Sequence, residues 1–200
     1  RDEEIGVLSN NFAVATVQRK VLDRSTVTAF FVNKQAFGSD FENNAKVNDS
    51  IYNRVAGAEF NFLSKNAEWD GKAYYHQSFE DQVSGNQSSF GTHLTYSIKK
   101  WKAEWNHSSV GEDYNAEVGF IRRKDYHFVN PKLEYNIFSK DNFINYHGPR
   151  ARTELYSDFG FHKIEHWYTG AYYIRLMNTS NVEFSVHDQF VELQRDFDPS

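Results

Sequence analysis

Residues 93–107 read HLTYSIKKWKAEWNH, and this stretch decides the expected fold. Every second residue is apolar, so in an extended chain the apolar side chains share one side. These apolar residues are Leu94, Tyr96, Ile98, Trp101, Ala103 and Trp105. The polar pair Lys99-Lys100 separates the two halves and is typical of a tight turn. The pattern predicts a β-hairpin with one apolar and one polar face, and the open question is whether the apolar face meets a protein core or lipid.

The composition favours a thin wall over a thick globular core. The 200 residues are 40% hydrophobic and 17% aromatic, yet the mean hydropathy is only −0.71. A chain that is polar on average but rich in aromatic residues suits a sheet with one apolar and one wet face. The length is consistent with one sizeable β domain, so we expect residues 1–200 to form a single β-barrel region within a longer chain.

Several classes of protein have little support. The net charge is −5 and no basic stripe is present, which argues against nucleic-acid binding. The absence of cysteine removes disulfides and thiolate metal sites. No run approaches the roughly 18 apolar residues of a membrane helix, so a membrane would have to be crossed by a closed barrel.

Strand-like segments recur at hairpin spacing, whereas no sustained helical pattern with caps occurs. The expected strands are about 11–21, 26–36, 51–64, 67–79, 88–99, 101–110, 115–129, 132–139, 150–162, 164–177 and 181–194. Tight turns are expected at 23–24, 65–66, 99–100 and 162–163, and long polar loops at 37–50 and 80–88. Long strands joined in this way predict an all-β, antiparallel up-and-down transmembrane β-barrel, or a consecutive arc of strands from a larger barrel.

The separation of faces is clear in some strands and broken in others. Within residues 182–190, Val182, Phe184 and Val186 lie opposite Glu183, Ser185 and His187. In residues 164–176 most apolar side chains share one side, but His166 interrupts that side, and Trp167 and Tyr173 lie on the other. Residues 26–36 are apolar on both faces. Because a barrel interior accommodates some aromatic side chains, these breaks weaken the barrel prediction without reversing it.

Aromatic residues also gather near the ends of the expected strands. They are Trp69, Trp101, Tyr114, Tyr126, Tyr146 and Trp167. Such rings are typical of the interfacial girdles of membrane barrels. Aromatic residues are also common in any β protein, so both interpretations stay open.

Four segments together resemble a family of bacterial envelope proteins. They are GEDYNAEVGFIRRKDY (111–126), FAVATVQRKVLDRSTVTAFFVNKQ (12–35), YNRVAGAEFNFLS (52–64) and the terminal FDPS. Members of this family carry an N-terminal carbohydrate-binding domain of the family-9 type, followed by a C-terminal region of unknown function taken to be an outer-membrane β-barrel. The resemblance implies that this chain is part of that barrel. Arg122 departs from the family pattern, in which a proline would precede Arg123.

Charged residues bunch at the expected start of strand 115–129. They are Glu112, Asp113, Glu117, Arg122 and Arg123. We expect them to form a charge network in a barrel lumen, because a polar interior suits alternating charges. The acidic members together with Asn115 could instead hold Ca²⁺, but the loop pattern of a known calcium site is absent.

No residue pattern indicates catalysis. The Gly-x-Ser-x-Gly elbow and the Gly-rich phosphate loop are both absent. His162 and His166 would lie about 13 Å apart on a strand, too far for one metal ion. We therefore predict no catalytic, cofactor-binding or metal-binding residues.

The expected function is passive. The sequence favours a bacterial outer-membrane barrel that acts as a pore, channel or membrane anchor linked to polysaccharide handling. Its expected partners are outer-membrane lipid, with glycan or other envelope proteins as further candidates, and no nucleic acid. The alternative is a soluble β-sandwich that binds carbohydrate, and an envelope enzyme has the weakest support.

Overall fold

The computed structural model describes residues 9–37, 39–40, 45–46, 51–140 and 143–192. All of its regular structure is β. The strands are β1 (Ser9–Val21), β2 (Ser25–Phe37), β3 (Ser39–Asp40), β4 (Ala45–Lys46), β5 (Tyr52–Leu63), β6 (Trp69–Glu80), β7 (Ser88–Ser97), β8 (Trp101–Val110), β9 (Tyr126–Val129), β10 (Lys132–Tyr135), β11 (Ile137–Phe138), β12 (Ile144–Ser157), β13 (Lys163–Leu176) and β14 (Asn181–Val191).

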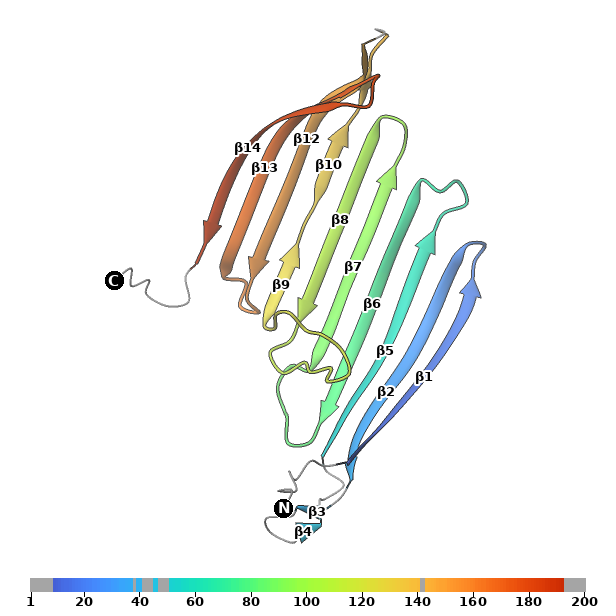
Figure 1. Cartoon of the computed structure of the whole chain (residues 1–200), viewed down its shortest axis with the longest axis vertical. Coiled ribbons are helices and arrows are strands. Elements are labelled where there is room, and N and C mark those ends of the chain that lie inside the picture. Colours follow the sequence, from blue (N-terminus) through green and yellow to red (C-terminus); the bar gives the residue numbers. More distant parts are fainter. Residues whose placement is uncertain (1–8, 38, 41–44, 47–50, 141–142, 193–200) are drawn as a thin grey trace, which may run out of the picture.

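One 12-stranded antiparallel sheet contains every strand except β3 and β4, which form a separate two-stranded pair. Its strands follow one another in chain order from β1 to β14, as in Figure 1. This confirms the expected all-β, antiparallel, up-and-down arrangement of long strands. In the described residues no pairing joins the edge strands β1 and β14 to each other.

Strands β9, β10 and β11 share one position between β8 and β12. Asn130 and Pro131 separate β9 from β10, where proline cannot donate a ladder hydrogen bond. The sheet nevertheless continues across the break. The N–H of Asn130 donates to Asn106 O at 2.8 Å, and Pro131 O accepts from the N–H of Thr153 at 3.0 Å.

The hairpin expected from residues 93–107 is present as β7 and β8. Leu94 pairs with Trp105 and Tyr96 with Ala103. The N–H of Ile98 donates to the carbonyl of Trp101 at 2.9 Å and closes the turn.

Two expected strands were wrong. Only 126–129 of the expected strand 115–129 is extended, because 111–125 forms a loop. The expected strand 150–162 begins earlier, at Ile144, and ends at Ser157. Glycine permits the early start, because a Cβ on Gly148 would lie 1.8 Å from the carbonyl oxygen of Tyr135.

Connections differ in length at the two ends of the sheet (Figure 1). At the upper end the strands are joined through residues 22–24, 64–68, 98–100, 139–143 and 177–180. At the lower end they are joined through residues 38–51, 81–87, 111–125 and 158–162. Apart from 158–162, the lower connections are the longer ones, which is the division typical of outer-membrane barrels.

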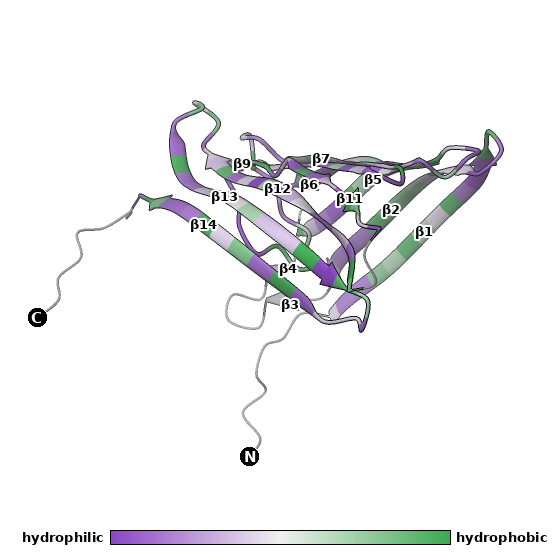
Figure 2. Ribbon diagram, turned by 90° about the horizontal axis from the view of Figure 1, so that it is seen from above, coloured by the Kyte–Doolittle hydropathy of each residue, from purple (hydrophilic) through white to green (hydrophobic). Residues whose placement is uncertain are grey.

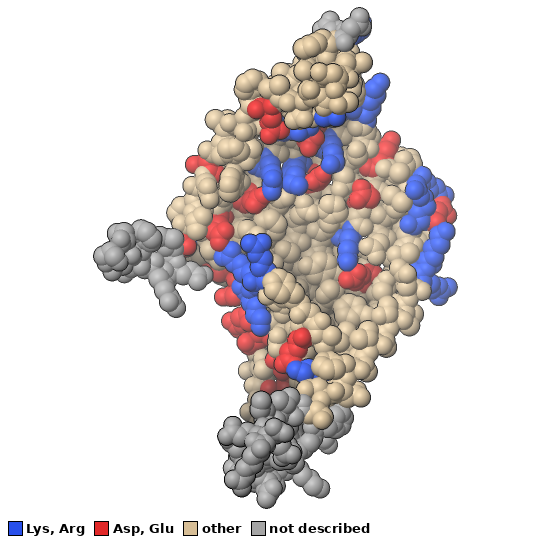
Figure 3. Space-filling view, viewed as in Figure 1, with Lys and Arg blue, Asp and Glu red and all other residues tan. Residues whose placement is uncertain are grey.

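The sheet is bowed, and its two faces differ in chemistry. Figure 2 shows β1 and β14 swept to the same side of the central strands β6 and β7. We call the outer side of the bow the convex face and the inner side the concave face. The convex face holds Leu94 and Trp105, and pairing extends it through Leu133 and Ala151 to Gly170. The concave face holds most of the ion-paired residues and is the side facing the viewer in Figure 3.

Among the residues whose burial the structure describes, the sheet has almost no hydrophobic core. The buried hydrophobic residues in this set are Ala36, Val55, Val110 and Tyr114. Many large apolar side chains are instead exposed on the convex face, among them Val17, Phe31, Leu133, Phe184 and Val186. In the part of the chain that the structure describes, no second layer packs against this face.

Candidate functional site

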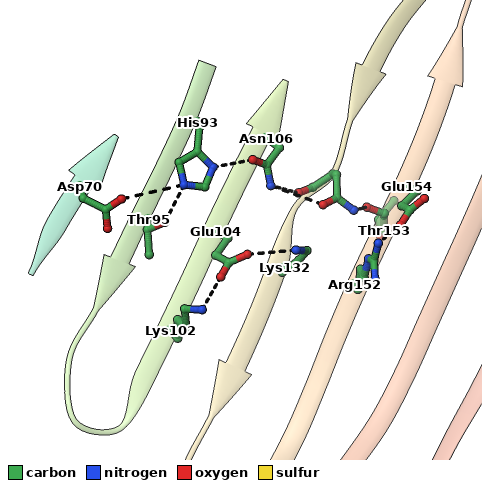
Figure 4. Close-up of polar contacts among 11 residues, drawn as sticks. Asp70, His93, Thr95, Lys102, Glu104, Asn106, Lys132, Arg152, Thr153 and Glu154 are labelled. Atoms are coloured by element: carbon green, nitrogen blue, oxygen red, sulfur yellow. Dashed lines mark hydrogen bonds and ion pairs between the residues drawn. The ribbon is translucent and has the colours of Figure 1, made fainter. Parts of the chain in front are cut away.

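Ion pairs cross the concave face from strand to strand. Glu104 on β8 lies 3.1 Å from Lys132 Nζ on β10 and also pairs with Lys102 on its own strand. On β12, Arg152 pairs with Glu154. Figure 4 shows these groups in one layer above the strands. Because alternate residues of each strand point to one face, the strand period itself places these charges together.

Arg150 extends the network toward the β14 edge. Its guanidinium lies 3.6 Å from Glu134 on β10 and 3.4 Å from Glu183 on β14. The same guanidinium lies 3.6 Å from the centroid of the Tyr173 ring. Cations and carboxylates thus neutralise one another over β8 to β14, where the upper part of Figure 3 shows blue and red side chains intermixed.

A chain of side-chain contacts runs parallel to the ion pairs (Figure 4). His93 contacts the side-chain oxygen of Asn106, and Asn106 Nδ2 donates to Asn130 Oδ1 at 3.4 Å. Asn130 Nδ2 then donates to the carbonyl of Thr153 at 2.8 Å. At the other end, Asp70 lies 3.9 Å from the His93 ring. Together these contacts link β6 to β12 through side chains on the concave face.

Loop 111–125 folds over the lower part of the concave face. Asn53 is only 2% exposed, and its Nδ2 donates to the carbonyl of Asn115 at 2.9 Å. Its Oδ1 accepts from the N–H of Glu117 at 3.3 Å. Ser78 Oγ accepts from the N–H of Asn115 at 3.0 Å. Buried polar side chains of distant strands therefore hold this loop against the sheet.

Burial in this chain concentrates beneath the loop. Tyr114 from the loop is 6% exposed, and burial raises the pKa of its phenol. Ser78 on the underlying strand β6 is fully buried and contacts the loop. The loop and the lower end of the concave face therefore pack together.

A cavity of about 650 Å³ lies between the tip of loop 111–125 and the strands behind it. Arg123 spans this space, with Nη1 2.6 Å from Glu165 Oε1 on β13. Its guanidinium also lies 4.8 Å from the ring centroid of Tyr156 on β12. The loop is thus attached at both of its ends and leaves a polar hollow behind its tip.

The five charged residues expected to form a network all lie in this loop: Glu112, Asp113, Glu117, Arg122 and Arg123. In the described residues no ion pair joins any two of them. Glu117 pairs instead with Lys34 on β2, and Arg123 with Glu165. Arg122 lines the cavity, while the first two acids flank Gly85. That these residues line a lumen stays a prediction.

Five of the six residues expected to face lipid share the convex face: Leu94, Tyr96, Trp101, Ala103 and Trp105. The sixth, Ile98, lies in the turn after β7. Aromatic rings extend this surface across the sheet. Tyr96 lies 4.6 Å from Trp69, and Trp101 lies 4.5 Å from Tyr135, between ring centroids. Their contact with lipid stays a prediction.

The aromatic residues near strand ends do not form one girdle. Trp69 and Trp101 lie on the convex face. Tyr126, Tyr146 and Trp167 lie on the concave face, and Tyr114 lies beneath its loop. Only the first two therefore suit an interfacial position on the apolar side.

The described residues contain no cluster of three or more His, Asp or Glu placed to hold a metal ion. His162 and His166 each have a separate acidic partner, Asp158 at 3.0 Å and Asp188 at 2.9 Å. These histidines therefore contact two different carboxylates.

Comparisons with protein families, with curated proteins and with solved structures found no match for this chain. Within the described ranges, no helix is long and apolar enough to span a bilayer, a result that concerns helices alone. The arguments below therefore depend on the geometry of the sheet.

Proposed function

We propose that the chain forms part of the wall of a bacterial outer-membrane β-barrel that acts as a passive pore, channel or membrane anchor. One observation carries the proposal: an exposed apolar band crosses the convex face from β1 to β14, and most of the ion pairs lie on the opposite face. The convex face would contact lipid, and the concave face would line a water-filled lumen.

An uncovered apolar face of this extent is costly in water. The exposed side chains include Phe31 at 42%, Trp105 at 44% and Phe184 at 66%. Each such side chain stabilises a fold by about 1.5–3 kcal/mol only when it is removed from water. Soluble monomers rarely expose apolar patches larger than a few hundred Å². Hydrocarbon covers such a face without a second protein layer.

The backbone suits the same environment. Strands β1, β2, β12 and β13 have 13, 13, 14 and 14 residues, and a tilted strand needs roughly 9–11 to cross a bilayer. Inside hydrocarbon, every backbone polar group requires a hydrogen bond. The proposal therefore requires partner strands on the free edges of β1 and β14, which we assign to the remainder of the barrel wall.

Loop 111–125 would narrow the lumen from the side of the longer connections. Its buried anchor, Asn53, and its ion pair from Arg123 to Glu165 hold it over the concave face. A solute would then pass between the loop tip and the opposite wall. The family resemblance adds a link to polysaccharide handling in the envelope.

Single-cysteine spin labelling tests the proposal cleanly, because the native chain has no cysteine. Nitroxides would be placed one at a time at positions 93–97 in the full chain, folded into lipid vesicles. Lipid-soluble oxygen should reach labels at 94 and 96, while a water-soluble nickel complex should reach those at 93 and 97. If 94 and 96 are shielded from both reagents, a second protein layer covers the face and the soluble sandwich is the better account.

A further inference from the structure

The four tryptophans of this chain divide unequally between the two faces. Trp69, Trp101 and Trp105 lie on the convex face, with 40%, 42% and 44% of their surface exposed. Trp167 lies on the concave face, where it pairs with Glu154 and is 42% exposed. The first three suit hydrocarbon. The fourth exposes an equally large ring toward the polar side, where lipid offers no compensation.

Trp167 stands at one side of a second cavity, of about 500 Å³, over strands β10 to β14. The cavity is lined by charged residues in equal numbers, Lys132, Arg150 and Arg152 against Glu134, Glu154 and Glu183. Trp167 is two residues nearer the upper end of β13 than Glu165, which holds the loop through Arg123. The ring therefore lies beyond the loop contact, on the same face.

Hydrogen bonds hold the indole ring in place. Trp167 Nε1–H donates to His187 Nδ1 at 3.3 Å, and the two rings meet nearly edge to face at 86°. Thr169 Oγ1 lies 3.1 Å from the same nitrogen, and Ser185 Oγ lies 3.1 Å from His187 Nε2. With both nitrogens of the imidazole engaged, His187 acts as a positioning residue for the tryptophan.

The chemistry around this ring selects a class of ligand. Phosphate groups favour a surplus of arginine and lysine, and quaternary ammonium groups favour a cage of several aromatic rings. Here the cations and carboxylates are balanced, and one flat ring is offered. A neutral sugar matches this arrangement, because one side of a pyranose ring carries C–H groups and its rim carries hydroxyls that bond to carboxylates and guanidiniums.

We propose that Trp167 is a stacking platform for neutral hexose units, with Arg152 and Glu154 as hydrogen-bonding partners for their hydroxyls. The inference deepens the proposed function, on which it rests, by naming the class of solute that the concave face recognises. An oligosaccharide would bind beyond the tip of loop 111–125.

Calorimetric titration of the full chain, folded in detergent micelles, tests this assignment. The probes are maltohexaose and cellohexaose, with choline and inorganic phosphate as charged comparisons. We expect saturable binding of at least one oligosaccharide. Trp167→Ala removes the stacking ring and should weaken the affinity about tenfold, whereas Trp167→Phe keeps a smaller ring and should weaken it about threefold. Trp105→Ala, on the opposite face, should leave the affinity unchanged.

Three results would overturn the inference. They are the absence of saturable binding of either oligosaccharide up to tens of millimolar, equal affinity in Trp167→Ala and the wild type, and stronger Trp167-dependent binding of choline or phosphate. Heat-modifiable migration on a gel reports whether each variant folds. If Trp167→Ala does not fold, Trp167→Phe still tests the inference.

Failure of the proposed function gives a different result. Sugar binding through Trp167 by a chain whose convex face stays away from lipid would preserve the inference and reject the barrel wall. Lipid contact by the convex face without any sugar binding would do the reverse.

Discussion

Trp105 and Trp167 have nearly the same exposure, 44% and 42%, but lie on opposite faces of one sheet. Trp105 pairs with Leu94 in an apolar band, without a polar partner for its ring in the described contacts. Trp167 donates a hydrogen bond to His187 and borders a cavity of paired charges. In a single-layered sheet, the exposed fraction of a side chain does not show whether that side chain meets water or lipid. The polarity of its neighbours on the same face indicates which medium it meets.

The largest expected effect comes from placing one charge on each face. Leu94→Arg puts a cation on the convex face, whereas His93→Arg puts a cation on the concave face, beside Asp70. An arginine facing lipid costs about 2–4 kcal/mol at the bilayer midplane and less near the interface. We expect Leu94→Arg to lower the stability of the chain in lipid vesicles more than His93→Arg does. Urea titration in vesicles measures this stability. Equal losses would mean that the two faces meet the same medium.

A smaller effect is expected where the concave face holds loop 111–125. Asn53→Ala removes the bonds to Asn115 and Glu117 and leaves their backbone groups without these partners. Such a loss costs about 1–3 kcal/mol. The freed loop should be cut faster by trypsin, which recognises its basic residues Arg122 and Arg123.

The matched control for this experiment is Lys65→Ala, which breaks only an exposed pair with Asp23 in another turn. Surface pairs of this kind contribute about 0–1 kcal/mol, so cleavage of the loop should stay at the wild-type rate. Unchanged cleavage in Asn53→Ala would show that the buried amide does not anchor the loop.

The smallest effect is expected outside both faces, in the connection between β12 and β13. The backbone N–H of His162 donates to Asp158 at 2.8 Å and lowers the pKa of this carboxyl below its ordinary 3.8. Because the folded-state pKa is depressed, the contribution to stability is present above about pH 4 and is lost as the pH falls through the lower value. The amide NMR signal of His162 should shift with this titration and should stay constant in Asp158→Asn. A shift that persists in the variant would assign the titration to another group.

Local alternation was sufficient to predict most of the sheet. Leu94, Tyr96, Trp101 and Trp105 share a face because the strand period is two, and tight turns keep successive strands adjacent. The order of the sheet follows from the same two facts. Whether the edges close into a barrel depends on partners that local alternation does not specify.

The loop escaped prediction because its alternation imitates a strand. Ala116, Val118 and Phe120 recur at every second position, yet no neighbouring strand pairs with them. Their segment is held by Asn53 and Ser78, which lie far away in the sequence. A local sequence pattern does not reveal contacts between residues that lie so far apart in the chain.

The site on the concave face was only partly visible in the sequence. Trp167 interrupted the alternation of residues 164–176, which predicted an aromatic ring on the polar face of the strand. Its partner His187 and the surrounding charges emerge only from the register between β12, β13 and β14. The physical reason is that a strand pattern assigns a residue to a face but not to its neighbours on that face.

Tryptophan quenching in lipid vesicles tests the central claim most directly. Vesicles of brominated phospholipid quench indoles that contact acyl chains, and acrylamide quenches indoles that contact water. The account predicts that bromolipid quenches most of the fluorescence, that acrylamide quenches a smaller component, and that Trp167→Phe removes only this second component. A chain whose fluorescence is insensitive to bromolipid, or whose Trp105→Phe variant loses the acrylamide component instead, would contradict the assignment of the convex face to lipid.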